Sequence, residues 1–333
     1  MYVTTSGRIH NFGAGPATLP LQVVEECQNA LPNLNESGFG LMEISHRSET
    51  FQEIIDSAMG RLRRILTIPD EYTVLFLQGG ASLQLYMSAL NLLRPGDHVD
   101  FLVTGAWSQK AMKEASRIGN ASPRWDDSEN GFKSIPKNGE YSIRNDATYV
   151  HYTSNNTLFG TQYHHLPDSD GKPRVLDASS DIAGVPIDVS AHDLIYAGAQ
   201  KNLGPSGVTI VILSPWAMKR VGDDLPTMLD YSVHSSKGSL FNTPNTFGIF
   251  VLDRVLNWVE ENGGLEGSVA RNIAKSNLLY EELDRSSFWK PHAKKDSRSV
   301  MNVTWRLPNE KLEEKFLQEA TSAGLGGLKG HRS

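Results

Sequence analysis

The sequence AGAQKNLGP at residues 197–205 places one lysine, Lys201, among small residues and turn formers. A lysine in a turn is most often a solvated surface charge. Here, however, the Gly and Ala neighbours leave room for a flat ligand that bulky residues would block. An amine that is partly shielded from water also has the lowered pKa that imine chemistry requires. We therefore expect Lys201 to form an imine.

Strand-like and helix-like runs alternate on both sides of this stretch. The strand-like runs are Val74 to Leu77, Val99 to Val103, Tyr149 to Tyr152, Val175 to Leu176, Leu194 to Ala197 and Val208 to Leu213, and helical runs cover Ser82 to Leu93 and Ser108 to Ile118. Such alternation predicts an α/β fold with a mostly parallel central sheet flanked by helices. Ligands of such sheets bind at strand ends, which is where Lys201 lies.

The length of the chain predicts two domains, because 333 residues exceed one ordinary compact core. We expect a large domain at residues 17–260 and a smaller α+β domain formed by residues 1–16 and 261–333. The patterns behind this division are a helix at Thr246 to Glu260, a helix at Leu265 to Leu283, a strand at Ser299 to Leu307, a helix at Glu310 to Ala323 and a closing segment near Leu328. Residues Asp126 to Asn145, rich in Asp, Asn, Gly and Lys, resemble a surface excursion.

Composition restricts the classes of partner. The formal net charge of -6 argues against a protein-wide basic surface for nucleic acid, although a small anionic ligand needs only a local cluster of cations. The single cysteine, Cys27, allows no intrachain disulfide and lies in a helical pattern typical of buried filler. We find no membrane-spanning run and no signal peptide. We therefore expect a cytoplasmic protein without nucleic-acid, membrane or metal partners.

Asp177 closes a short apolar run in RVLDASS, residues 174–180. An aspartate in this position usually opens a turn or caps a helix. A cofactor with a pyridine ring, however, needs a carboxylate beside its ring nitrogen. The pairing of Asp177 with Lys201, at the ends of two predicted strands, favours the cofactor role.

The sequence QGGAS, residues 78–82, connects a predicted strand to a predicted helix. Free backbone N–H groups and the helix dipole at such a junction favour a phosphate. A Gly-Gly turn is more often only a tight connection. A nucleotide-binding module is a further alternative, but the stretch has neither the Walker signature nor the three-glycine dinucleotide fingerprint.

Three further motifs carry aromatic or cationic side chains. Trp107, in TGAWS, follows a predicted strand and could stack on a cofactor ring or pack in the core. His46-Arg47 and the pair His331-Arg332 near the chain end suit phosphate or carboxylate recognition. Each cationic pair taken alone would more often be a solvated surface.

Ordered segments along nearly the whole chain resemble the class V aminotransferases of fold type I, and among them the phosphoserine aminotransferases. The segments are NFGAGPA (11–17), SHRS (45–48), FLQGGAS (76–82), TGAW (104–107), AGAQKN (197–202), FNTP (241–244) and LKGHR (328–332). The resemblance implies pyridoxal 5′-phosphate as the cofactor, held by a covalent imine on Lys201. It also implies that Asp177 holds the pyridine nitrogen, that Trp107 stacks on the ring and that Thr157 forms a hydrogen bond to the cofactor.

The same resemblance implies how the anions are held. Ala81, Ser82 and Gln200 would hold the cofactor phosphate, together with Asn242 and Thr243 from the second subunit of a homodimer. The anionic end of the substrate would be held by His46, Arg47, His331 and Arg332. Members of the family continue past Ser333 with a Gly-Gly segment, another arginine and a final helix, so we expect this chain to be truncated at its C-terminal end.

The implied reaction transfers the amino group of L-glutamate to 3-phosphohydroxypyruvate and gives O-phospho-L-serine and 2-oxoglutarate, a step of serine biosynthesis. A related threonine derivative, 4-phosphohydroxy-L-threonine of pyridoxine biosynthesis, is a second possible substrate. One alternative is another class V transaminase, such as the serine–glyoxylate type, which needs no second cationic cluster. Another alternative is a catalytically silent protein that binds pyridoxal phosphate without turnover.

Overall fold

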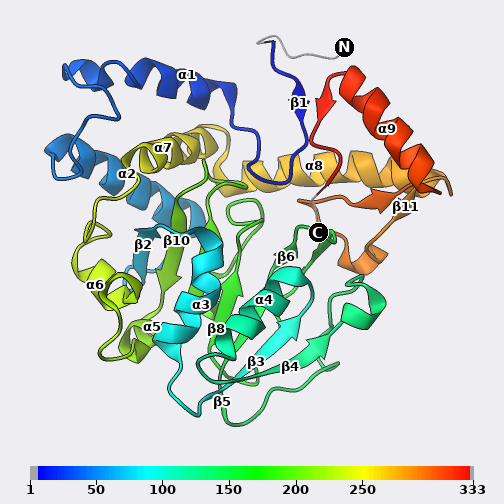
Figure 1. Ribbon diagram of the computed structural model, residues 1–333, viewed down its shortest axis with the longest axis horizontal. Helices are drawn as coiled ribbons and strands as arrows, with labels where there is room; N and C mark the ends of the chain where they lie inside the picture. The colour runs from blue at the N-terminus through cyan, green and yellow to red at the C-terminus, as the bar shows by residue number, and fades with distance from the viewer. Residues whose placement is uncertain (1–6, 331–333) are drawn as a thin grey trace.

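The computed structural model describes residues 7–330. Its centre is a seven-stranded sheet with the order β2-β10-β9-β8-β5-β3-β4 (Figure 1). In this order the strands are Thr73–Leu77, Thr209–Leu213, Leu194–Gly198, Arg174–Asp177, Ala147–Thr153, His98–Val103 and Asn120–Asp126. β10 runs antiparallel to both of its neighbours, and every pair from β9 to β4 is parallel. The sheet is therefore mostly parallel, as predicted.

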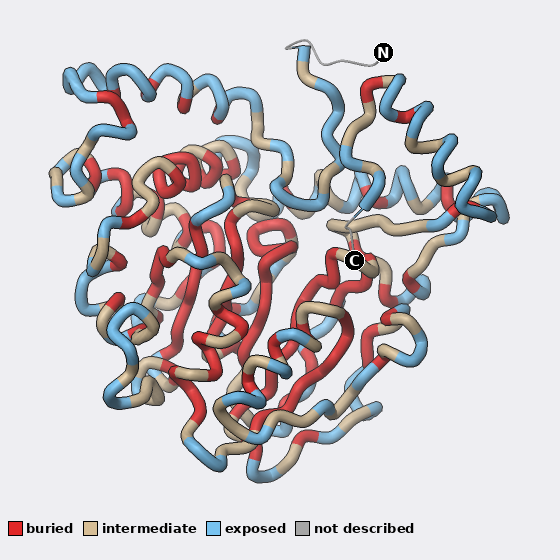
Figure 2. The backbone as a smooth tube through the Cα atoms, in the orientation of Figure 1, coloured by how far each residue is buried: buried red, intermediate tan, exposed pale blue. Residues whose placement is uncertain are grey.

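Both faces of the sheet are covered, which explains why its inner strands are mostly buried and rich in apolar residues. All five residues of β9 and all five of β10 are buried. Successive side chains point to opposite faces, so Ile195 and Ala197 enter one hydrophobic core and Leu194 and Tyr196 enter the other. Figure 2 shows the buried residues concentrated along the strands and α7 (Thr246–Glu261).

Helices cover the two faces in two groups. α1 (Leu21–Ala30), α2 (Glu49–Leu66) and α7 contribute to the first core, and α3 (Gly80–Leu92) and α4 (Ala106–Ala115) contribute to the second. The two short helices α5 (Pro215–Arg220) and α6 (Tyr231–Ser236) also join the second core. Single-turn 3₁₀ helices lie at Leu34–Glu36, Ser128–Asn130, Val189–Ala191, Thr227–Leu229 and Lys295–Ser297.

The C-terminal part starts with the long helix α8 (Gly264–Arg285). It continues with β11 (Lys290–Pro291), β12 (Trp305–Arg306), α9 (Glu310–Ser322) and β13 (Leu325–Gly326). β13 pairs in parallel with β1 (His10–Asn11), so the first and last described segments lie side by side (Figure 1). The helices expected at the end of the chain are therefore confirmed, with bounds shifted by one or two residues.

Two expectations about irregular segments are corrected. Within the strand expected from Ser299 to Leu307, only β12 is a strand, and Ser299 instead turns its side chain toward Asn155. The supposed surface excursion from Asp126 to Asn145 buries Phe132, Ile135 and Ile143. It also bonds to the C-terminal part, because the Ile135 N–H donates to Ser297 Oγ at 3.0 Å. This segment thus ties the sheet to residues near the chain end.

The expected place of Cys27 is confirmed, since it is buried within α1. Two further hairpin strands, β6 (Asn155–Asn156) and β7 (Thr161–Gln162), follow β5 and lead away from the sheet. Across residues 7–330, none of the helices combines the length and the apolar character needed to span a bilayer.

Candidate active site

Lys201 lies in the connection from β9 to β10, and its side chain reaches residues from two other parts of the sheet. Its Nζ donates a hydrogen bond to Thr157 Oγ1 at 2.5 Å. The same Nζ lies 5.8 Å from the centre of the Trp107 ring, which belongs to the first turn of α4. Three residues expected at one site are therefore together in the fold, although they come from three separate connections.

Small residues are required around the lysine. A Cβ added to Gly15 would lie 3.0 Å from Lys201 Cγ, so any larger residue would press on the lysine stem. A Cβ on Gly198 would lie 2.5 Å from Gln200 Oε1. The Ala17 N–H donates to the Gln200 carbonyl at 2.8 Å, which fixes the N-terminal segment against the lysine loop. The role of Gly15 could not be read from its own neighbours in the sequence.

The environment of Lys201 makes its amine easier to deprotonate than that of a solvated lysine. Burial lowers the pKa of the Lys201 amine, while the negative charges of Asp177 and Asp181 act in the opposite direction. The net direction is downward. A neutral amine has the free electron pair that attacks a carbonyl or takes up a proton.

Asp177 is the last residue of β8, whose neighbour in the sheet is β9. Its side chain is 4% exposed, and its Oδ1 accepts a hydrogen bond from the Ser179 N–H at 2.9 Å. Burial raises the pKa of the Asp177 carboxyl, whereas the hydrogen bonds from Ser179 and the charge of Lys201 lower it. A buried carboxylate of this kind is suited to a cationic ring nitrogen.

The glycine turn between β2 and α3 leaves a helix end open. Gly79 and Gly80 have φ angles of 87° and 66°, a conformation that other residues rarely adopt. No side chain caps the N-terminus of α3, and a Cβ added to Gly80 would meet no atom within 4 Å. Ala81 is half-buried and Ser82 is exposed in the first turn. Free N–H groups with open space in front of them suit a phosphate.

The family follows from comparison with known proteins. The family model for class-V aminotransferases matches residues 9–332, which is nearly the whole chain. The chain belongs to the class-V aminotransferases.

Several relatives of this class-V aminotransferase are phosphoserine aminotransferases. The chain is 51% identical to the phosphoserine aminotransferase of Geobacillus kaustophilus over 327 residues. This alignment covers 98% of the chain and 91% of the relative. The solved phosphoserine aminotransferase from Bacillus circulans subsp. alkalophilus is 42% identical, with a TM-score of 0.95 over 98% of this chain and 90% of that one. A pyridoxal-phosphate-bound phosphoserine aminotransferase from Trichomonas vaginalis is 32% identical, with a TM-score of 0.92 over 97% and 92% of the chains. These likenesses confirm the expected fold.

Two residues expected at the phosphate lie near the glycine turn of their own chain. Asn242 Nδ2 donates to Gln78 Oε1 at 3.1 Å, and Gln78 Nε2 donates to the Thr243 carbonyl at 3.3 Å. The neighbouring Phe241 side chain is 41% exposed. The expectation that Asn242 and Thr243 serve the site of a second subunit stays a prediction.

Two of the four cationic residues predicted for the substrate lie within the described part of the chain. His46 and Arg47 lie in the loop before α2, where Ser48 caps the helix. His46 is half-buried and Arg47 is exposed. His331 and Arg332 lie outside the described residues. A shared anion pocket of these four residues therefore stays a prediction.

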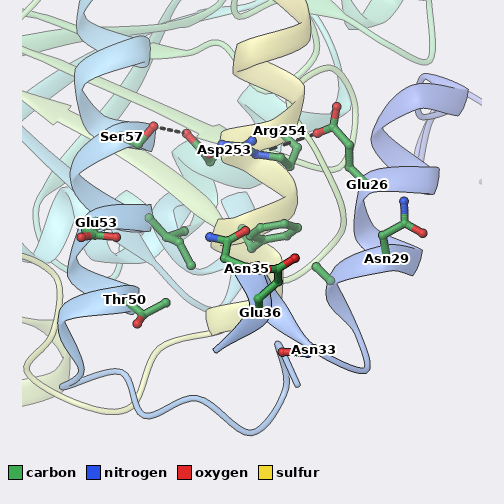
Figure 3. Close-up of a pocket in the computed structure, with 13 residues that line it drawn as sticks. Glu26, Asn29, Asn33, Asn35, Glu36, Thr50, Glu53, Ser57, Asp253 and Arg254 are labelled. Atoms are coloured by element: carbon green, nitrogen blue, oxygen red, sulfur yellow. Dashed lines mark hydrogen bonds and ion pairs between the residues drawn. The ribbon is translucent and has the colours of Figure 1, made fainter. Parts of the chain in front are cut away.

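A polar pocket of about 450 Å³ opens between α1, α2 and α7, and no residue predicted for the site lines it (Figure 3). Its buried carboxylate is already satisfied, because Asp253 accepts hydrogen bonds from Ser57 at 2.7 Å and from Arg61 at 3.1 Å and also contacts Arg254. Within the described part of the chain, no group of three or more His, Cys, Asp and Glu side chains is placed to hold a metal ion. The candidate active site therefore remains the region around Lys201.

Proposed function

We propose that this class-V aminotransferase transfers the amino group of L-glutamate to 3-phosphohydroxypyruvate, giving O-phospho-L-serine and 2-oxoglutarate. One observation carries the proposal: Lys201, held by Thr157 and facing Trp107, lies in the loop after β9, next to the strand that ends in the buried Asp177. The 51% identity to a phosphoserine aminotransferase supports this substrate rather than that of another transaminase.

The residues present fit pyridoxal 5′-phosphate as the cofactor. The uncapped end of α3, with open space in front of Gly80, suits a phosphate, and the buried Asp177 suits a pyridinium nitrogen. When bound, pyridoxal phosphate supplies an electron sink for negative charge on the α carbon of the substrate. The residues that would hold it are Lys201, through a covalent imine, and Asp177, Trp107, Thr157, Ala81, Ser82 and Gln200.

Lys201 is proposed as the acid and base of the reaction. Because burial lowers its pKa, the Lys201 amine gives up a proton more readily than a solvated lysine does. Nζ can then take the proton from the α carbon of the substrate and later return it. Thr157 Oγ1 accepts a hydrogen bond from Nζ and so fixes the direction of the amine.

The substrate phosphate is assigned to His46, Arg47, His331 and Arg332. Arginine binds phosphate with two parallel hydrogen bonds, and a neighbouring histidine adds a further donor. Two anionic substrates, one with a phosphate and one with a distal carboxylate, would use this one pocket in turn. A substrate without a second anion would leave these cations without a partner.

The proposed site is completed by a second copy of the chain. The segments that a second copy would supply, His46-Arg47 and Asn242-Thr243, each follow exposed apolar side chains. Phe39 and Met42, which are 61% and 71% exposed, precede His46, and Phe241 precedes Asn242. Large apolar groups exposed in this way are typical of protein interfaces. A homodimer would cover these side chains and bring His46, Arg47, Asn242 and Thr243 to the partner's lysine.

The absorption spectrum of the purified full-length protein with pyridoxal phosphate tests the function. We expect O-phospho-L-serine to abolish the visible band of the bound cofactor and L-serine, the matched control, to leave it. Loss of the band with L-serine, and its return when glyoxylate is added, would instead assign the serine–glyoxylate type. A band that no amino acid changes would show a silent binder and refute the transaminase.

A further inference from the structure

A second buried carboxylate lies beside the candidate site. No sequence pattern assigned it a role, and the proposed mechanism does not involve it. Asp181 is 1% exposed and lies in the turn after β8, four residues beyond Asp177. Its Oδ1 lies 2.5 Å from Ser154 Oγ, and its Oδ2 accepts a hydrogen bond from Gln162 Nε2 at 3.1 Å. Both oxygens are thus engaged by side chains from the segment that follows β5.

Ser154 connects this carboxylate to the backbone of Asp177. The Ser154 N–H donates to the Asp177 carbonyl at 3.1 Å, and Ser154 Oγ lies 3.2 Å from the same carbonyl. Ser154 also begins the short loop that carries Thr157, the hydrogen-bond partner of Lys201. Asp181 therefore anchors the strand end of Asp177 and the loop of Thr157 through one serine.

The Ser154 hydroxyl has one proton and two acceptors within reach, the Asp181 carboxylate and the Asp177 carbonyl. Two hydrogen-bonding arrangements are therefore possible. When Asp181 is ionised, Ser154 donates to its carboxylate. When Asp181 is protonated, Asp181 donates to Ser154 Oγ, and the hydroxyl can turn to the Asp177 carbonyl. The hydrogen bonds beneath Asp177 thus depend on the charge of Asp181.

The charges around Asp181 oppose one another. The negative charge of Asp177 disfavours its ionisation and the positive charge of Lys201 favours it. Burial is the main effect and raises the pKa of Asp181 to about 6, although Ser154 and Gln162 lower it. The charge of Asp181 also raises the pKa of the buried Tyr152.

Gln162 extends the contact to the C-terminal part of the chain. While its Nε2 donates to Asp181, its Oε1 accepts a hydrogen bond from the Val300 N–H at 3.0 Å. Next to it, Asn155 Nδ2 donates to Asn302 Oδ1 at 2.7 Å. The segment around residue 300 is therefore attached to the strand ends by buried side-chain hydrogen bonds.

We propose that Asp181 is a positioning residue for transamination, which holds the Asp177 and Thr157 segments through Ser154 and places a second negative charge near Lys201. This proposal rests on the proposed function because it names transamination as the reaction that Asp181 serves. The predicted effect of Asp181 on Lys201, however, can be measured without substrate or cofactor. The two proposals can therefore fail separately.

The test measures the pH midpoint of Lys201 acetylation by trace acetic anhydride, read by mass spectrometry on the full-length chain stripped of cofactor. We expect Asp181→Asn to lower this midpoint by about one pH unit, because a nearby opposite charge is removed. The matched control is Asp253→Asn, which removes an equally buried carboxylate outside the site and should leave the midpoint unchanged. Equal midpoints in the wild type and Asp181→Asn, or equal shifts in both variants, would overturn the proposal.

A second measurement keeps the proposal testable if Asp181→Asn does not fold. Infrared spectra of the wild type between pH 5 and 7 should contain a titrating carboxylic C=O band that shifts in Ser154→Ala, because Ser154 is the hydrogen-bond partner of Asp181. Ser88→Ala, at a buried serine of α3, serves as the control and should leave the band in place. The absence of such a band, or a band that ignores Ser154→Ala, would refute the role of Asp181.

Discussion

Lys201 and Thr157 are 44 residues apart in the sequence, yet Nζ of the lysine donates a hydrogen bond to Oγ1 of the threonine. The threonine follows β5 and the lysine follows β9, and β8 lies between these two strands in the sheet. The contact therefore spans the strand that ends in Asp177. It fixes the direction of the amine before any ligand is present.

Replacing Thr157 by valine should weaken the site without unfolding it. Valine keeps the shape of threonine but accepts no hydrogen bond from Nζ, so we expect kcat/KM to fall about 10-fold. Steady-state kinetics with O-phospho-L-serine and 2-oxoglutarate measure this. Thr153→Val is the control, because Thr153 Oγ1 is buried without a hydrogen-bond partner among the described residues. Unchanged kinetics in Thr157→Val would show that the contact has no function.

Removing the amine of Lys201 should abolish turnover. Lys201→Ala has neither the imine-forming group nor the proposed acid and base, so we expect kcat to fall by at least about 10³-fold. Single-turnover kinetics and the visible spectrum measure the two losses separately. Lys219→Ala, at an exposed lysine of α5, should behave as the wild type. Turnover retained in a folded Lys201→Ala protein would exclude the proposed proton transfer.

A methyl group on Gly15 should disturb the lysine. The added Cβ would lie 3.0 Å from Lys201 Cγ, so the lysine stem must move. We expect Gly15→Ala to lower kcat/KM about 10-fold and to destabilise the protein by about 1 kcal/mol. Enzyme kinetics and urea unfolding measure the two effects. Gly60→Ala, inside α2 with ordinary contact distances, should leave the kinetics intact.

The raised pKa of Asp181 has a consequence for stability that depends on pH. The pKa of its carboxyl is about 6 in the folded chain against an ordinary value of 3.8, so the folded state binds this proton more tightly. The corresponding stabilisation is complete below pH 3.8 and is lost as the pH rises through 6. We therefore compare the free energy of unfolding of the wild type with that of Asp181→Asn. The difference, wild type minus variant, should fall by about 2 kcal/mol from pH 4 to pH 7. A constant difference in urea unfolding experiments would contradict this.

Much of the fold could be predicted because the inner strands are buried on both faces. The runs that became β9 and β10 consist of buried, mostly apolar residues, and each is followed by turn formers. The edge strand β4 was missed, since its sequence NASPRWD contains a proline and four polar residues and none of its residues is buried. The segment from Ser299 was read as a strand because side-chain hydrogen bonds to Asn155 leave no trace in the local pattern.

The site could be predicted in part. Lys201 and Asp177 were predicted because each closely follows a strand-like run, and parallel strands bring such ends together. Thr157 came only from the family resemblance, and Asp181 and Gly15 had no role assigned. Their functions depend on contacts between distant segments, such as Asp181 with Ser154 and Gly15 with Lys201, which single-sequence patterns do not contain.

The pairing of β1 with β13 also sets the order in which the site can form during synthesis. Within the described chain, β13 is the strand that β1 pairs with, and it ends at Gly326. The stretch between β1 and α1 carries Gly15 and Ala17, which cover the Lys201 loop. Synthesis must therefore proceed as far as β13 before this pairing can anchor the segment that follows β1 over the lysine. A nascent chain that already holds the complete sheet still lacks this cover.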